Sequence, residues 1–150
     1  MRAADIADSV GQAIAGRRAA LQFSGGKDSL ACLYLLHPLV EQGLPVYWLS
    51  TGDTIPETRA VLDQVRTWVP DLRTVQTDVL AWKAAHGIPS DVTTAQSSWI
   101  GQAYGMSDTP LVGRMDCCVA NLMQPMHQRM LADGIEAVSY THLTLPTIYS

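Results

Sequence analysis

The chain has 150 residues, 47% of them hydrophobic and 16% charged, which is typical of one globular domain with a hydrophobic core. Its net charge of −4 argues against a broad basic surface for nucleic acid. No apolar run reaches the roughly 20 residues of a membrane span, and the N-terminus has no signal-peptide core, so we expect a soluble, cytoplasmic protein.

The first third of the chain alternates between helical and strand patterns. Apolar residues at every fourth position predict a helix over about residues 6–14, which Gly16 can end. Residues 19–23 form a short apolar run typical of a buried strand. After a polar loop, the almost wholly apolar run to Leu36 predicts a helix that is perturbed near Pro38.

Two further strands enclose another helix. We predict a strand that ends near Ser50, a helix over about residues 56–68 and a strand over residues 72–77. Repeated strand-helix-strand units of this length imply a parallel sheet with right-handed crossovers. The sequence therefore predicts an α/β fold with helices on both faces of a parallel sheet, and a ligand site at the carboxyl ends of its strands.

The second half of the chain is less regular. Residues 87–114 show no sustained period and are rich in Gly, Ser, Thr and Asp, so we expect a long loop or short helices that frame the substrate. A helix over about residues 117–131, interrupted near Pro125, comes next. The segment GIEAV, residues 134–138, indicates the start of a fourth strand.

The C-terminal segment is unlike the rest of the chain. Residues 138–147, VSYTHLTLPT, resemble a translated sequencing adapter, so we expect a partial nucleotide-binding domain over residues 1–137 and a non-native tail over 138–150. A C-terminally truncated sheet would leave apolar surface uncovered. The alternative is a natural strand followed by a disordered end.

The polar loop SGGKDS, residues 24–29, has the composition of a phosphate site. Its two adjacent glycines let backbone N–H groups face a phosphate, and the following helix presents free N–H groups. Lys27 adds a positive charge, and Ser24 and Ser29 add hydroxyl donors. The spacing is not that of a Walker loop. The alternative is a glycine turn in which Asp28 or Ser29 caps the helix.

SGGKDS after a strand resembles the PP-loop of the ATP pyrophosphatase superfamily, whose fold is adenine nucleotide alpha hydrolase-like. The segments STGDTIPETRA and CCVANLMQPM resemble the phosphoadenosine phosphosulfate (PAPS) reductase-like family, and the whole resemblance covers about residues 21–137. It implies that an adenine nucleotide is bound by Ser24, Gly25, Gly26, Lys27, Asp28, Ser29, Thr51, Gly52, Asp53, Glu57 and Thr58. It also implies catalytic roles for Lys27, Asp28 and Asp53, with magnesium held by the two aspartates.

The resemblance leaves the reaction open. In one reading ATP is cleaved to an adenylate and pyrophosphate to activate an acceptor substrate, and the intact loop favours it because sulfate-reducing relatives usually have a degenerate loop. In the second, PAPS or adenylylsulfate is reduced in sulfur metabolism by a cysteine near the C-terminus. In the third reading, the protein binds a nucleotide without turning it over. The acceptor stays unidentified, and a homodimer is compatible with each reading.

The adjacent Cys117 and Cys118 have two interpretations. In adenylylsulfate-reducing relatives such a pair supplies two of the four thiolates of an iron-sulfur cluster, whereas this chain has three cysteines in all. The other interpretation is that both are small core residues of a helix. Arg114, a few residues earlier, is a candidate contact for a phosphate or sulfate, or the partner of Asp116 in a surface ion pair.

Overall fold

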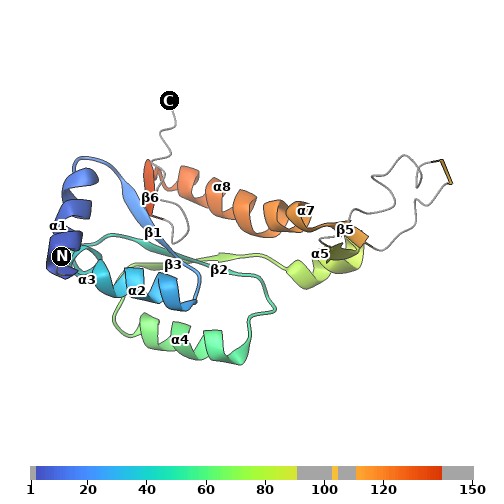
Figure 1. Cartoon of the computed structure of the whole chain (residues 1–150), viewed down its shortest axis with the longest axis horizontal. Helices are drawn as coiled ribbons and strands as arrows, with labels where there is room; N and C mark the ends of the chain where they lie inside the picture. The colour runs from blue at the N-terminus through green and yellow to red at the C-terminus, as the bar shows by residue number, and fades with distance from the viewer. Residues whose placement is uncertain (1–2, 91–102, 105–110, 140–150) are drawn as a thin grey trace. The chain divides into compact units, whose positions relative to one another are not determined.

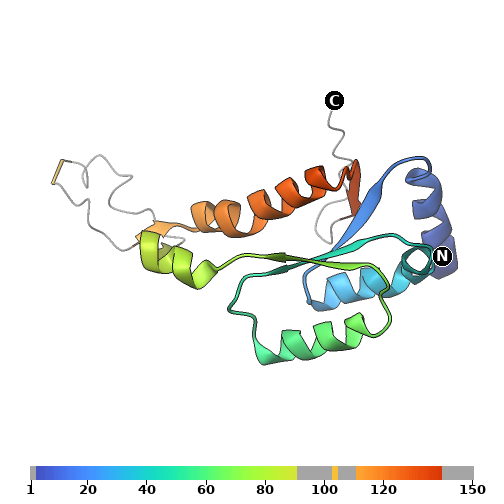
Figure 2. The same ribbon diagram turned by 180° about the vertical axis from the view of Figure 1, so that it is seen from behind.

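The computed structural model describes residues 3–90, 103–104 and 111–139 of the chain (Figures 1 and 2). These residues fall into two compact units. The first unit is drawn from residues 1–49, 54–75 and 128–150, and the second from residues 50–53 and 76–127. Residues 140–150 of the predicted tail, and residues 91–102 and 105–110 of the predicted loop, lie outside the described residues.

A parallel sheet of four strands forms the centre of the fold and confirms the predicted α/β class. Its order is β3-β2-β1-β6. The central strand β1 (Ala19–Phe23) pairs in parallel with β2 (Val46–Ser50) and β6 (Ala137–Ser139), and β3 (Leu72–Gln76) lies beside β2. Parallel pairing places the carboxyl ends of neighbouring strands at one edge of the sheet, where ligands bind in such folds.

Both faces of this sheet are covered in the first unit, as predicted. Alternate residues of β1 and β2 point into a core with α2 (Lys27–Leu35), α3 (His37–Glu41) and α4 (Pro56–Arg66). On the opposite face the last turn of α8 (Gln124–Ala132) contacts the strands, because Gln22 lies 3.4 Å from the sulfur of Met130. Figures 1 and 2 show α2 and α4 on one side of the strands and α8 on the other. The helix α1 (Ala3–Ala13) packs on α2 and α3.

The second unit contains elements that the sequence analysis did not predict. These are α5 (Val79–His86) and a small parallel sheet of β4 (Ile88–Ser90) and β5 (Leu111–Gly113), in which Ile88 lies opposite Leu111. Strands β4 and β5 occupy the two ends of the segment that we expected to be a loop or short helices. The expectation of an irregular segment is therefore wrong at both of its ends.

The helix predicted over residues 117–131 begins earlier and contains a π-helical turn. It consists of α7 (Arg114–Cys118), the π-helix η2 (Val119–Met123) and α8. Pro125 has no N–H group to donate to the carbonyl of Asn121 four residues earlier. That carbonyl instead accepts a hydrogen bond of 3.1 Å from the hydroxyl of Thr77. The predicted interruption thus lies just before the proline.

Strand β6 continues past Ala137, where we expected the register of the fourth strand to end. Val138 lies opposite Ala20 and Ser139 opposite Leu21 in the parallel pair with β1. The strand therefore runs two residues into the segment predicted to be a non-native tail.

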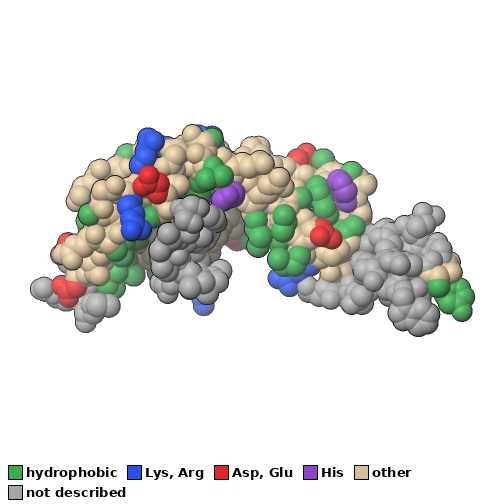
Figure 3. Space-filling view, turned by 90° about the horizontal axis from the view of Figure 1, so that it is seen from above, with side chains coloured by type: hydrophobic (Ala, Val, Ile, Leu, Met, Phe, Trp, Pro, Cys, Tyr) green, Lys and Arg blue, Asp and Glu red, His purple; other side chains and the backbone are tan. Residues whose placement is uncertain are grey.

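Apolar side chains reach the surface of the helices after β5. Met115, Val119, Leu122 and Met123 are exposed, and Figure 3 shows hydrophobic side chains at the surface of the face viewed from above. Among the described residues, no helix is both long and apolar enough to cross a membrane.

Candidate functional site

The loop between β1 and α2 is held together by the hydroxyl of Ser29. This hydroxyl donates to the carbonyl of Gly26 at 2.8 Å and accepts from the N–H and the hydroxyl of Ser24, at 3.3 and 3.0 Å. One donor and two acceptor positions are all that a serine hydroxyl has. Because Ser29 is also 1% exposed, its hydroxyl braces the loop and has no capacity left for a phosphate.

Helix α2 begins without a side-chain cap. Gly26 occupies the N-cap position, with extended backbone angles and no side-chain hydrogen bond to the helix. The alternative in which Asp28 or Ser29 caps this helix is therefore wrong. Since the first N–H groups of a helix have no partner within the helix, they are available to an anion at the end of β1.

Two charged side chains stand at this helix start. Lys27 and Asp28 are exposed, and neither forms an ion pair with any residue that the structure describes. Among the described residues, the ammonium of Lys27 thus has no counter-charge beside the free N–H groups, an arrangement that favours an anion.

The start of α4 packs directly on the loop. Gly25 has a φ of +82°, and a Cβ placed on it would lie 2.5 Å from the Cγ2 methyl of Thr58. Both the backbone angle and the lack of space therefore require glycine at this position. The structure brings Thr58 against the loop, while Glu57, its neighbour in the first turn of α4, is exposed.

The predicted residues after β2 belong to the second unit, where they are tied to α5. The hydroxyl of Thr51 donates to Asp53 at 2.6 Å, and the carbonyl of Thr51 accepts the N–H of Val79. Lys83 of α5 lies 3.6 Å from the other oxygen of Asp53. The hydrogen bond from Thr51, together with the positive charge of Lys83, lowers the pKa of Asp53 below 3.8.

Lys83 is absent from the residues predicted from the sequence. A local signal was available, because Asp78 caps α5 by accepting the N–H of Ala81 at 2.9 Å. Recognising this cap would have predicted the helix. The contact between Lys83 and Asp53 itself joins residues 30 positions apart, so no local pattern predicts it.

The cysteine pair lies in the second unit, in α7. Cys117 is buried, and Asn121, in the π-helix, donates its side-chain amide to the Cys117 carbonyl at 3.1 Å and lies 3.7 Å from the sulfur. Cys118 is half-buried, and Arg114 is exposed at the start of α7. Burial and the bonds from Asn121 favour the interpretation of Cys117 as a core residue.

The described residues fit the two candidate cofactors unequally. None of them forms a group of three or more His, Cys, Asp or Glu side chains that could hold a metal ion. Magnesium in phosphate sites is usually held by one or two carboxylates and the substrate. Asp28 offers an exposed carboxylate, whereas Asp53 is already paired with Lys83. An iron-sulfur cluster requires four thiolates, and the three cysteines of this chain do not fit it alone.

Comparison with family models identifies the relatives of this fold. The model of the phosphoadenosine phosphosulfate reductase domain matches residues 18–97, which span β1, the loop, β2, α4, β3 and α5. The chain belongs to this family. The PAPS reductase family uses nucleotide substrates such as PAPS, so membership supports nucleotide binding. The matched region ends before Cys117 and Cys118. No curated protein in the comparison matches the chain.

Proposed function

We propose that this member of the PAPS reductase family binds an adenine nucleotide at the SGGKDS loop and cleaves ATP to an adenylate and pyrophosphate. One observation carries the proposal. At the carboxyl end of the central strand, the loop presents uncapped N–H groups and the ammonium of Lys27, which pairs with no described residue. Such an arrangement favours a group with several negative charges, such as the polyphosphate of ATP.

The residues of the loop have different roles in the proposed reaction. Gly25 keeps the loop close to α4, Ser29 holds its shape, and Lys27 neutralises the charge that develops on the departing pyrophosphate. An oxygen of the acceptor attacks the α-phosphorus, the bond from that phosphorus to the bridging oxygen breaks, and pyrophosphate leaves with the electron pair. Magnesium, when bound by Asp28 and the phosphates, would further stabilise this charge. Thr51, Gly52, Asp53 and Glu57 stay predictions that rest on the resemblance.

The loop cannot supply all of the affinity. Four charge-assisted hydrogen bonds at about 1.5 to 3 kcal/mol each contribute roughly 6 to 12 kcal/mol, against an association cost of about 4 to 15 kcal/mol. Contacts to the base and ribose must therefore add to the phosphate contacts. We expect adenosine itself to compete measurably with ATP for the site.

A second candidate is reduction of PAPS or adenylylsulfate, which the name of the matching family favours. In that reaction a thiolate attacks the sulfur of the sulfated nucleotide, and the nucleotide leaves with the electrons of the broken sulfur–oxygen bond. A thiol reductant then releases sulfite. The burial of Cys117 counts against that residue as the nucleophile, because an attacking thiolate must be accessible.

Product analysis separates these functions. Purified protein is incubated with magnesium and ATP in a metabolite extract that supplies acceptors, or with PAPS and dithiothreitol, and pyrophosphate and sulfite are measured. Pyrophosphate supports ATP cleavage, sulfite supports the reductase, and tight nucleotide binding with neither product supports a non-catalytic module. Absence of binding to both nucleotides would refute the site.

The matched variants are Lys27→Ala and Arg66→Ala. Lys27 is at the loop, whereas Arg66 is a half-exposed cation at the far end of α4 that pairs with Asp63. Both variants lose one positive charge from the first unit. The proposal requires that the first, and not the second, loses nucleotide affinity.

A further inference from the structure

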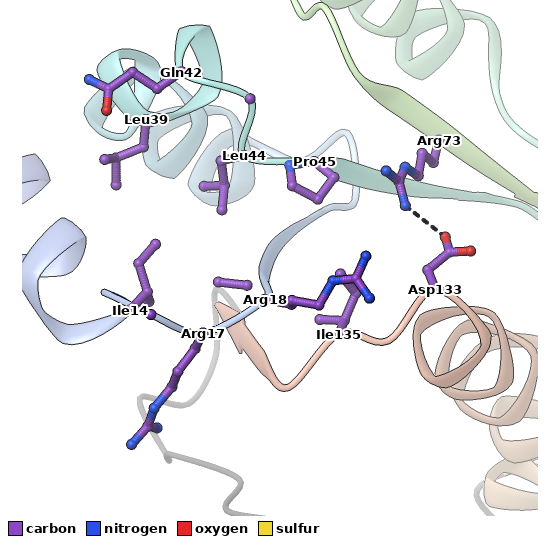
Figure 4. A pocket seen from close by; sticks show the side chains of 13 residues that line it. Ile14, Arg17, Arg18, Leu39, Gln42, Leu44, Pro45, Arg73, Asp133 and Ile135 are labelled. Atoms are coloured by element: carbon purple, nitrogen blue, oxygen red, sulfur yellow. Dashed lines mark hydrogen bonds and ion pairs between the residues drawn. The ribbon is translucent and has the colours of Figure 1, made fainter.

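A cavity of about 620 Å³ opens at the amino edge of the sheet in the first unit (Figure 4). It is lined by Ala19, the first residue of β1, whereas the SGGKDS loop follows Phe23, the last. Five residues at about 3.3 Å each separate the two by roughly 16 Å along the strand. The cavity is therefore distinct from the proposed nucleotide site.

Apolar side chains and polar groups together line this cavity. The apolar part of the lining has five half-buried side chains from four segments of the first unit: Ile14, Leu39, Leu44, Pro45 and Ile135. Ile14 follows α1, Leu39 belongs to α3, and the others precede β2 and β6. Small-molecule sites have volumes of about 300 to 1,000 Å³ and orient the ligand with a few fixed polar groups.

One guanidinium in this cavity, that of Arg18, has no charged partner among the described residues. The carbonyl of Arg18 accepts the N–H groups of Glu136 and Ala137, at 2.7 and 3.2 Å, which fixes its backbone beside β6. Its side chain lies over Gly134, where an added Cβ would come within 2.7 Å of Nη1. Within the described part of the chain, no ion pair involves the Arg18 guanidinium.

The other charges that line the cavity are already engaged or directed elsewhere. Arg73 donates to both oxygens of Asp71 at 2.9 and 2.8 Å and to Asp133 at 2.9 Å. Asp133 also accepts from Tyr47 and Arg129, and these two hydrogen bonds are the main cause of its pKa of about 2. Figure 4 shows Arg17 extending away from the cavity and Arg18 directed toward Ile135.

We propose that this cavity binds a small organic acid, with its carboxylate paired to Arg18 and its apolar body against Ile14, Leu39 and Leu44. A guanidinium can donate two parallel hydrogen bonds to one carboxylate, which explains why an arginine fits this role. The distance of roughly 16 Å from the loop excludes this acid as the acceptor that attacks the nucleotide. It is a second ligand, and its binding does not depend on the proposed function.

Binding of phenylacetate to the whole chain, measured by isothermal titration calorimetry, tests this proposal. Phenylacetamide has the same apolar body without the charge, and inorganic phosphate has the charge without the body. We expect saturable binding of phenylacetate at millimolar concentration and much weaker binding of both controls. Arg18→Gln should weaken phenylacetate binding about tenfold or more, whereas Arg17→Gln should leave it unchanged.

Several results would overturn the proposal. They are absence of saturable phenylacetate binding, equal binding of phenylacetamide, equal or tighter binding of phosphate, and undiminished binding to Arg18→Gln. The amide and phosphate comparisons use the unaltered protein, so they remain decisive if the variant does not fold. ATP binding measured in parallel reports on the SGGKDS loop alone, and its loss in Lys27→Ala should leave phenylacetate binding intact.

Discussion

Replacement of Gly25 by alanine should destabilise the protein for two reasons, which can be measured separately. The first is the backbone, because a φ of +82° costs a residue with a Cβ about 1 to 2 kcal/mol. The second is contact, because the new Cβ would lie 2.5 Å from the Cγ2 methyl of Thr58, and relieving such overpacking typically costs about 1 to 3 kcal/mol. We expect Gly25→Ala to lower the free energy of unfolding by about 2 to 5 kcal/mol.

Two comparisons separate the causes. Gly16 has a φ of +75° and no atom within 4 Å of an added Cβ, so Gly16→Ala should show the backbone cost alone. Thr58→Ser removes the obstructing methyl, and the remaining Cβ of residue 58 is 3.8 Å away, an ordinary contact. The double variant Gly25→Ala/Thr58→Ser should therefore recover to about the level of Gly16→Ala.

Urea unfolding of the four proteins and the unaltered chain measures these differences. Nucleotide binding adds a functional readout, because the packing of Thr58 positions the loop and should be disturbed in Gly25→Ala. Equal loss of stability in Gly25→Ala and Gly16→Ala would refute the contact between the loop and α4. Failure of Thr58→Ser to restore stability would do the same.

Three other side chains carry further predictions. Lys27→Ala should reduce ATP affinity about tenfold or more, since a charged hydrogen bond contributes about 1.5 to 3 kcal/mol; unchanged affinity in calorimetry would remove the loop from the site. Ser29→Ala should lower the free energy of unfolding by about 1 to 3 kcal/mol because it leaves loop groups unpaired, and an unchanged urea midpoint would contradict the brace. The carboxylate of Asp133, with its pKa lowered from 3.8 to about 2, stabilises the fold above pH 3.8, and this stabilisation is lost as the pH falls toward 2. In Asp133→Asn the free energy of unfolding should therefore fall less between pH 3.8 and 2 than in the unaltered protein. An equal fall in both proteins would show that Asp133 does not cause the loss of stability in acid.

The central part of the fold was predictable because its signals are local. Strand β1 has the predicted bounds, and α2 ends one residue before Leu36, the predicted end of that helix. An apolar run, two glycines and a second apolar run lie adjacent in the sequence, so each element is specified by its own residues. The resemblance to the PAPS reductase family rests on the segments STGDTIPETRA and CCVANLMQPM, and the match over residues 18–97, which contains the loop and the first of these segments, confirms the family.

The small sheet of the second unit could not be predicted in this way. Strands β4 and β5 have three residues each, too few to show a period, and 20 residues separate them along the chain. Their pairing depends on partners brought from a distance. The π-helix also depends on a distant partner. The sequence indicates that Pro125 disturbs the helix, but the hydroxyl that bonds to the freed carbonyl comes from Thr77.

The sequence by itself determined the residue types of the candidate site, since glycines, a lysine and a helix start specify an anion-binding loop. Tertiary structure decided what each side chain does. Ser29 is turned inward as a brace, Asp53 is paired with Lys83, and the Arg18 guanidinium lines a cavity without an ion pair to any described residue. Hydrogen bonds and ion pairs join groups by proximity in space, and folding brings them together independently of their spacing along the chain.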